Sequence, residues 1–206
     1  MQQKLALCDR RIVIATGNQS KIKEMTDPLL ALGFDVKPQS DFGISEVKET
    51  GTTFFENAII KARHAARVTG IPAIADDSGL EVDILNGRPG VYSSRYSGVG
   101  ATDESNIEML LNDLRSTPGQ QRTARFICVL AFMHHADDPM PLVCHGKWEG
   151  KVSREPEGEN GFGYDPIFFV ESERCTSAQL DPTRKKRLSH RGQALRSFCE
   201  EVERVC

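Results

Sequence analysis

The sequence lacks long apolar runs and closely spaced cysteines. No apolar stretch approaches the roughly 18 residues that a membrane-spanning helix needs. The first apolar stretch is too short for a signal peptide and is interrupted by Asp9, Arg10 and Arg11. The six cysteines are widely spread and show no C-x-x-C spacing, which disfavours structural zinc and a disulfide framework. We therefore expect a cytoplasmic protein that is neither exported nor embedded in a membrane.

A strong charge of either sign is also missing. The formal net charge is -3, so no overall field attracts the protein to nucleic acid or to anionic lipid. A polyanionic ligand must therefore be bound by local cations. The 206 residues contain 39% apolar and 27% charged side chains, which is ordinary for a folded globular protein. We expect one domain covering residues 1–206.

The order of the predicted elements favours an α/β fold with a mixed sheet. "RIVIA" and "IPAIA" are typical of buried strands, and each follows or precedes an amphipathic helical segment. Thr53 and Glu56 match a capping box at the start of one helix, which Gly70 ends. Later, "TARFICVLAFMHH" and "PLVCHGKWEGKV" predict two long strands joined as a hairpin. Helices alternating with strands, followed by a hairpin, indicate a sheet that is not purely parallel.

The segment "TGNQSK", Thr16 to Lys21, joins the first strand to a helix. Such a turn directs backbone N–H groups and the positive end of the helix dipole toward one point, and Lys21 adds a cation there. This arrangement suits a phosphate. The segment matches neither of the common glycine-rich nucleotide motifs, so a plain architectural turn is the alternative interpretation.

Carboxylates beside glycine in "KETG" and "ADDSG" are candidates for a metal site. Mg²⁺ accepts a few carboxylate oxygens and keeps several waters, so Glu49 with Asp76 or Asp77 would suffice. The alternative is a solvated turn, because acidic residues next to Gly and Ser favour turns. The position after a buried strand, where α/β folds often bind ligands, supports the metal site.

Two segments in the last third could bind a nucleotide. "GFGYD", from Gly161 to Asp165, combines aromatic faces with glycines and a carboxylate, although a kinked strand with core aromatics is the commoner case. "RKKRLSHR", from Arg184 to Arg191, places five Lys and Arg residues in eight positions. Such a run is often a solvated face, but here it is also the densest source of positive charge for a triphosphate.

Taken together, six segments resemble the inosine/xanthosine triphosphate pyrophosphatase family, the (d)ITP/XTP house-cleaning enzymes. They are "ATGNQSK", "ETGTTFFENAIIKA", "IADDSGLEVDIL", "GRPGVYSSRYSG", "GFGYDPIFF" and "SHRGQAL". The resemblance implies an elongated α/β fold with a long mixed sheet, two lobes enclosing a central cleft, and a homodimer. It implies Mg²⁺-dependent hydrolysis of ITP, dITP or XTP to the nucleoside monophosphate and pyrophosphate, with no stable nucleic-acid partner.

The same resemblance implies roles for particular residues. Glu49 and Asp77 are the implied metal ligands, and Asp77 is also the implied proton acceptor. A bound cation lowers the basicity of Asp77, so the division of labour between Asp76 and Asp77 stays open. The implied substrate contacts are Thr16, Gly17, Asn18, Gln19, Ser20, Lys21, Lys61, Ser78, Phe162, Gly163, Tyr164, Asp165, Lys185, His190 and Arg191.

Base choice requires that a 6-keto group is accepted and an amino group rejected. A donor such as His190 or Arg191 opposite that keto oxygen would favour the keto group and would leave the amino group of adenine facing another donor. We expect both ATP and GTP to be poor substrates. Two alternatives stay open. One is a pyrophosphatase for other modified nucleotides, and the other is a non-catalytic nucleotide-binding or RNA-binding module that uses the basic segment.

Overall fold

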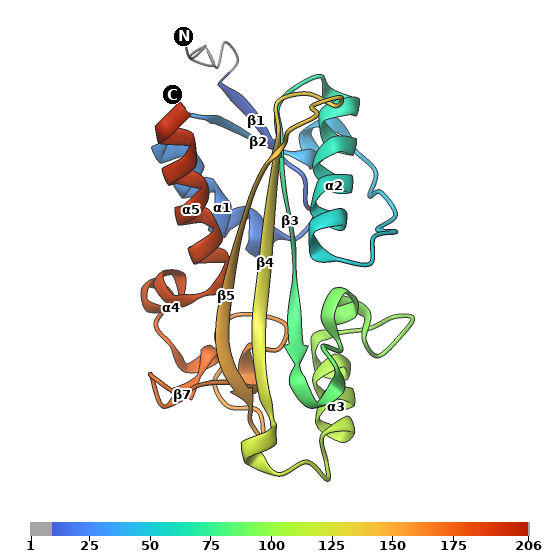
Figure 1. Cartoon of the computed structure of the whole chain (residues 1–206), viewed down its shortest axis with the longest axis vertical. Helices are drawn as coiled ribbons and strands as arrows, with labels where there is room; N and C mark the ends of the chain where they lie inside the picture. Colours follow the sequence, from blue (N-terminus) through green and yellow to red (C-terminus); the bar gives the residue numbers. More distant parts are fainter. Residues whose placement is uncertain (1–9, 206) are drawn as a thin grey trace. The chain divides into compact units, whose positions relative to one another are not determined.

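A computed structural model describes residues 10–205 of the chain (Figure 1). The predictions about the first apolar stretch and about Cys8 and Cys206 lie outside these residues. Within them, the cysteines are free thiols. None of the helices in residues 10–205 has both the length and the apolar character that crossing a membrane requires.

The chain forms strands and helices in the alternating order that its pattern predicts (Figure 1). The strands are β1 (Arg11–Ile14), β2 (Asp35–Pro38), β3 (Ala73–Val82), β4 (Thr123–Met133), β5 (Leu142–Val152), β6 (Phe168–Val170) and β7 (Cys175–Thr176). The α-helices are α1 (Gln19–Ala31), α2 (Phe54–Thr69), α3 (Asp103–Asp113), α4 (Pro182–Leu188) and α5 (His190–Val205).

The strands form one mixed sheet in the order β2-β1-β3-β4-β5-β6-β7. β1 runs parallel to β2 and to β3, whereas β6 runs antiparallel to β5 and to β7. β4 and β5 are consecutive in the chain and neighbours in the sheet, as the predicted hairpin requires. The predicted α/β class with a mixed sheet is therefore confirmed.

The described residues divide into two compact units. The first unit contains residues 10–77, 128–145 and 191–205, and the second contains residues 78–127 and 146–190. β3, β4 and β5 each contribute residues to both units. A single domain over residues 1–206 stays a prediction.

The first unit has its own apolar core on strands and two helices. Ile12 and Ile14 of β1 pack in a cluster with Leu29 of α1, Phe132 of β4 and Phe198 of α5. All five side chains are almost completely buried. Because the apolar residues of α1 and α5 recur at helical spacing, each helix presents one stripe to this core.

Helix α2 has the start and end that its sequence predicts. The Thr53 side chain accepts a hydrogen bond from the Glu56 N–H, and the Glu56 carboxylate accepts one from the Thr53 N–H. Gly70 ends the helix with a left-handed backbone, at a φ of 65°. The alanines Ala58, Ala62, Ala65 and Ala66 are all buried, so the face with the smallest side chains is the face that packs.

β3 differs from the solvated turn considered for "ADDSG". Asp76, Asp77, Ser78 and Gly79 lie inside one continuous strand, in which Asp76 is 0% and Asp77 is 6% exposed. A strand can carry buried carboxylates only where cations or hydrogen-bond donors compensate them. Both aspartates have such partners in the first unit, so the strand continues.

The second unit has a core rich in aromatic side chains. Trp148 packs on Phe168, with ring centroids 5.2 Å apart, and Phe126 packs on Phe168 at 4.5 Å. Helix α3 begins with a capping box made by Thr102 and Ser105. The basic segment "TRKKRL" lies in α4 and is largely exposed.

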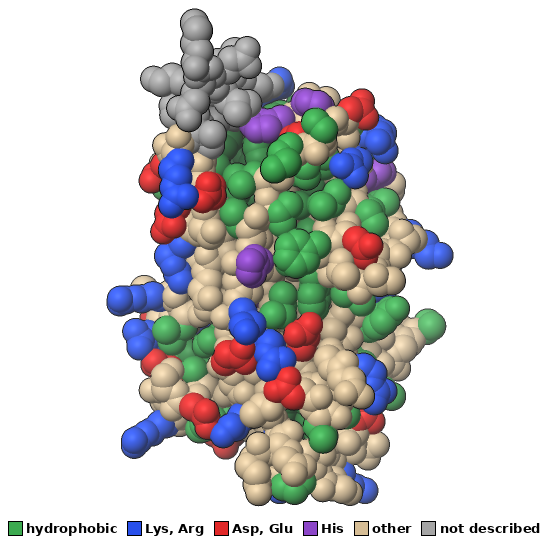
Figure 2. Space-filling model, in the orientation of Figure 1, with side chains coloured by type: hydrophobic (Ala, Val, Ile, Leu, Met, Phe, Trp, Pro, Cys, Tyr) green, Lys and Arg blue, Asp and Glu red, His purple; other side chains and the backbone are tan. Residues whose placement is uncertain are grey.

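Charges of both signs are interleaved on the surface. In the second unit, Arg125 pairs with Asp83 at 2.7 Å and with Glu149 at 3.1 Å. Figure 2 shows acidic and basic side chains side by side on the face in view, without a broad field of one sign. This agrees with the small net charge, and it gives no support to the RNA-binding alternative.

A close contact in the second unit makes Gly150 sensitive to substitution. A Cβ atom there would lie 2.6 Å from the Phe168 ring and 2.6 Å from the Phe169 carbonyl oxygen. We expect Gly150→Ala to lower the free energy of unfolding by about 1–3 kcal/mol, because the core cannot admit the methyl group without shifting. Urea denaturation measures this loss. Gly119→Ala is the control, since a Cβ atom at Gly119 meets nothing within 4 Å. Equal stability of the two variants would contradict the expectation.

Candidate functional site

The turn between β1 and α1 contains the predicted phosphate-binding segment. Asn18 is the N-cap of α1, and its side-chain oxygen accepts a hydrogen bond from the Lys21 N–H at 3.1 Å. Thr16 is half-buried and its hydroxyl accepts a hydrogen bond from the Asn18 N–H at 3.2 Å. Gly17, Gln19 and Ser20 are exposed. The start of α1 therefore faces water, as an anion-binding helix terminus must.

Asp76 lies buried in contact with two basic side chains of the first unit, Lys21 and Arg191. The Lys21 ammonium is 2.9 Å from the Asp76 carboxylate, and the Arg191 guanidinium is 3.2 Å from the same oxygen. Burial alone would raise the pKa of Asp76, but the charges of Lys21, Arg191 and Lys61 outweigh it and hold this pKa far below its usual value. Asp76 is therefore ionised, and it fixes the position of Lys21.

Arg191 is tied to a second carboxylate as well. Its guanidinium donates to Glu24 of α1 at 2.7 Å, and the Arg191 side chain is only 3% exposed. Burial by itself would lower the pKa of Arg191, but Asp76 and Glu24 raise it above the usual value. Arg191 thus joins α5 to α1 and to β3.

Asp77 belongs to a different group of side chains, which includes Glu49 and α2. The Lys61 ammonium is 2.7 Å from Glu49 and 3.0 Å from Asp77. The Asn57 amide donates to the other Asp77 oxygen at 3.3 Å. Because successive side chains of a strand point to opposite faces, Asp76 meets α1 and α5 while Asp77 meets α2. The structure thus groups Glu49 with Asp77 rather than with Asp76.

The electrostatics of this second group differ from those around Asp76. Burial raises the pKa of Asp77, the neighbouring Glu49 raises it further, and Lys61 and Lys21 only partly compensate. Burial would lower the pKa of Lys61, but Asp77, Asp76 and Glu49 together raise it. Lys61 is therefore a charged ammonium held between Glu49 and Asp77. The negative charge of Asp77 remains only partly compensated by its neighbours.

These residues have the chemistry of a magnesium site. Glu49 and Asp77 offer hard carboxylate oxygens that converge on one cation, the Lys61 ammonium. Residues 10–205 contain no group of three or more His, Cys, Asp or Glu side chains that could hold a metal ion. Two carboxylates completed by water and phosphate oxygens fit the coordination that Mg²⁺ prefers.

In the second unit, Asp165 organises the segment "GFGYD". Its carboxylate accepts hydrogen bonds from the Phe162 N–H at 2.8 Å and from the Ser177 hydroxyl at 2.7 Å, and it pairs with Lys185. The Lys185 ammonium also lies 5.6 Å from the centre of the Phe162 ring. Gly161, at a φ of 87°, leaves room for this pair, since a Cβ atom there would lie 2.6 Å from the Lys185 nitrogen. Phe162, Asp165 and Lys185 are therefore brought together.

Three other predicted residues are placed differently in the second unit. Tyr164 is 4% exposed, belongs to the aromatic core and donates its hydroxyl to the Ser93 carbonyl oxygen at 2.8 Å. His190 is buried and stacks on Phe126, with ring centroids 4.7 Å apart. Ser78 is half-buried and follows Asp77 directly in β3.

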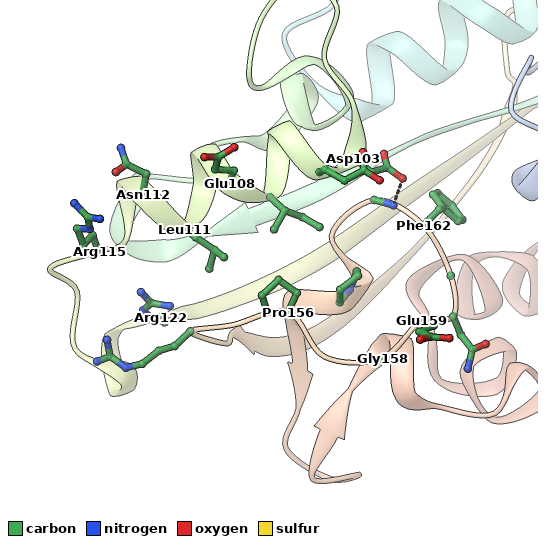
Figure 3. A pocket seen from close by; sticks show the side chains of 17 residues that line it. Asp103, Glu108, Leu111, Asn112, Arg115, Arg122, Pro156, Gly158, Glu159 and Phe162 are labelled. Atoms are coloured by element: carbon green, nitrogen blue, oxygen red, sulfur yellow. Dashed lines mark hydrogen bonds between the residues drawn. The ribbon is translucent and has the colours of Figure 1, made fainter.

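A pocket of about 830 Å³ lies within the second unit (Figure 3). Figure 3 shows α3 along one wall, with Leu111 directed toward the facing segment that carries Pro156 and Gly158. Phe162 and Asp103 lie at one end, and Arg115 and Arg122 at the other. Three arginines and four carboxylates line the pocket, so it has no excess of positive charge that would select an anion. The segment from Gly161 to Gly163, which carries the Phe162 ring, borders this pocket.

The sequence interpretation missed two residues of the first-unit groups, Asn57 and Glu24. Asn57 lies four positions before Lys61 on the same face of α2, and Glu24 lies three positions after Lys21 on α1. These spacings bring side chains together on a helix and could have identified both residues.

Comparison with known proteins assigns the chain to a family. The profile of the Ham1 family matches residues 12–201. The chain belongs to the Ham1 family. This Ham1 chain is 61% identical over 199 residues to a dITP/XTP pyrophosphatase of Vibrio cholerae serotype O1, covering 96% of this chain and 100% of that protein.

Two solved structures have the same fold as this Ham1 family member. A HAM1 protein from Coxiella burnetii has a TM-score of 0.89 and 52% identity, covering 94% of this chain and 98% of that one. The Ham1 protein of Staphylococcus aureus has a TM-score of 0.85 and 43% identity, with the same coverage of 94% and 98%. Family and fold therefore agree over nearly the whole chain.

The buried pair of Arg191 and Asp76 makes Arg191 important for stability. We expect Arg191→Met to lower the free energy of unfolding by about 3–5 kcal/mol, because it removes one cation from a buried carboxylate. Chemical denaturation measures the loss. Arg196→Met is the matched control, the same change at an exposed position of α5, and should cost less than about 1 kcal/mol. If both variants unfold at the same denaturant concentration, the pair with Asp76 contributes nothing.

Proposed function

We propose that this protein is a nucleoside triphosphate pyrophosphatase for the non-standard purine nucleotides ITP, dITP and XTP. It would release pyrophosphate and the nucleoside monophosphate, and so remove deaminated purines from the nucleotide pool. The observation that carries the proposal is the 61% identity, over the full length of that relative, to a protein named dITP/XTP pyrophosphatase. The two groups of carboxylates and lysines in the first unit support it independently, because triphosphate hydrolysis needs cations and a base.

We propose Mg²⁺ as the cofactor, held by Glu49 and Asp77. The support is the donor set, two carboxylates that already share one cation, and the unfavourable environment of the Asp77 charge. When bound, Mg²⁺ would supply a Lewis acid that neutralises phosphate charge and lowers the pKa of a coordinated water. The protein's own contribution is to hold the two carboxylates in place through Lys61 and Asn57.

The phosphates are assigned to the start of α1 and to the lysines. The N–H groups of Thr16 to Ser20 and the ammonium groups of Lys21 and Lys61 would bind phosphate oxygens and stabilise the leaving pyrophosphate. Water would attack the α-phosphorus as the bond to the bridging oxygen of the β-phosphate breaks, and Asp77 would orient this water and accept its proton. Asp76, whose Oδ2 atom is paired with both Lys21 and Arg191, would position Lys21 instead.

We propose that the purine ring contacts Phe162. Phe162 offers a half-buried aromatic face, and Asp165 and Lys185 lie beside it. Gly163, Tyr164, Ser78, His190 and Arg191 stay proposed substrate contacts. Tyr164, His190 and Arg191 are buried here, so their contacts would be limited to an edge of each side chain.

We also propose that the protein acts in the cytoplasm as a homodimer. The free thiols of Cys128, Cys144, Cys175 and Cys199 support a reducing compartment. The family resemblance, which implies a homodimer, supports the second copy. A molar mass near 22.9 kDa in solution, that of one chain, would exclude the dimer.

The experiment that tests the function is a coupled assay for pyrophosphate release from a panel of nucleoside triphosphates with Mg²⁺. ITP, dITP and XTP should be hydrolysed with a kcat/KM at least about a hundredfold above that for ATP and GTP, because a mispaired polar group in the base site is costly. Removal of Mg²⁺ by a chelator should stop release, and added Mg²⁺ should restore it. Comparable turnover of GTP and ITP contradicts the proposed specificity.

Asp77→Asn is the decisive variant in this assay. We expect its kcat to fall at least about a hundredfold, since an amide cannot accept the proton. Asp41→Asn, the same change at an exposed position in the first unit, is the control and should keep full activity. Normal hydrolysis of ITP by the Asp77→Asn protein would remove Asp77 from the reaction.

A further inference from the structure

Two carboxylates hold two successive N–H groups of the segment Gly161 to Asp165. The Phe162 N–H donates to Asp165 at 2.8 Å, and the Gly163 N–H donates to Asp103 at 2.6 Å. Asp165 lies within the segment itself. Asp103 comes from the first turn of α3, sixty positions away in the chain, and Figure 3 shows its hydrogen bond spanning to the loop.

The segment needs these hydrogen bonds because packing holds it only partly. Gly161 and Gly163 adopt left-handed backbones, at φ of 87° and 60°, and flexible glycines on both sides of Phe162 allow many other conformations. Gly161, Phe162 and Gly163 all border the pocket of about 830 Å³, so one side of the segment faces open space (Figure 3). The orientation of the Phe162 ring therefore depends on how the neighbouring N–H groups are held.

The Asp103 carboxylate is not required for the start of α3. Thr102 and Ser105 already form a complete capping box there, and Glu104 supplies a second negative charge in the same turn. Asp103 instead directs its carboxylate out of the helix to the loop. A hydrogen bond from an N–H to a carboxylate is stronger than one between neutral groups, so this contact is suited to fixing a mobile loop.

We propose that Asp103 is a positioning residue that holds the Phe162 loop in the conformation that binds the purine ring. This inference rests on the proposed function, in which Phe162 receives the base. In the proposed function neither the phosphates nor the attacking water is assigned to Asp103, so Asp103 contributes to binding and not to the bond-breaking step. Its loss frees the loop, and the substrate must then order the loop as it binds.

The test compares Asp103→Ala, Asp103→Asn and the control Glu104→Gln, which removes a charge from the same helical turn. In Asp103→Ala the KM for ITP should rise about three- to tenfold, the factor that one lost hydrogen bond represents, while kcat changes less than about twofold. Asp103→Asn keeps an acceptor oxygen and should lie between wild type and Asp103→Ala. Glu104→Gln should leave KM unchanged.

Amide hydrogen exchange provides a readout that needs no activity. Exchange of the Gly163 N–H should accelerate about three- to tenfold in Asp103→Ala, and should not change in Glu104→Gln. An unchanged exchange rate or an unchanged KM overturns the proposal. An equal rise of KM in Glu104→Gln also overturns it, because the effect then comes from the helix charge. If the wild type releases no pyrophosphate from ITP, the proposed function fails, while the exchange rates still decide whether Asp103 holds the loop.

Discussion

Asp76 and Asp77 place two negative charges side by side in a buried strand, and the first unit is organised around their compensation. A pair of carboxylates on the same side of the strand would repel strongly and raise each other's pKa. The alternation of side chains along β3 avoids this, because each carboxylate meets a different set of cations. Lys21 and Arg191 form ion pairs with Asp76, and Lys61 forms one with Asp77.

This compensation ties together segments that are far apart in the sequence. Through Asp76, the start of α1 and the start of α5 are both anchored to β3. Through Asp77 and Lys61, α2 and the segment around Glu49 are anchored to the same strand. Buried ion pairs of this kind are weak evidence for stability, since removing charges from water is costly.

Much of the fold could be predicted because local signals and packing agree. The capping boxes at Thr53 and Thr102 and the alanine face of α2 each fix a helix from a few neighbouring residues. The continuity of β3 could not be predicted. Local propensity treats "ADDSG" as a turn, and only partners from α1, α2 and α5 make a strand possible there. Tertiary charge compensation overrides the local preference in this case.

The sequence identifies a set of candidate site residues but not the partners of each side chain. Sequence places Glu49 near either aspartate, and the geometry selects Asp77 because Lys61 bridges the two. The burial of Tyr164 could not be predicted either, because an aromatic residue in "GFGYD" can face either a ligand or the interior. His190 is also buried, although it belongs to the basic segment. The contact made by Asp103 could not be predicted from the sequence, because its partner is the backbone of a segment sixty positions away.

The same arrangement of a lysine on a buried carboxylate occurs separately in each unit. Lys61 forms ion pairs with Glu49 and Asp77 in the first unit, and Lys185 forms an ion pair with Asp165 in the second. In each pair the carboxylate also accepts a hydrogen bond from a neutral donor, from Asn57 in one case and from Ser177 and the Phe162 N–H in the other. The carboxylate therefore keeps a partner if its lysine turns toward a ligand. A lysine held in this way is oriented before any ligand arrives, which lowers the cost of ordering it during binding.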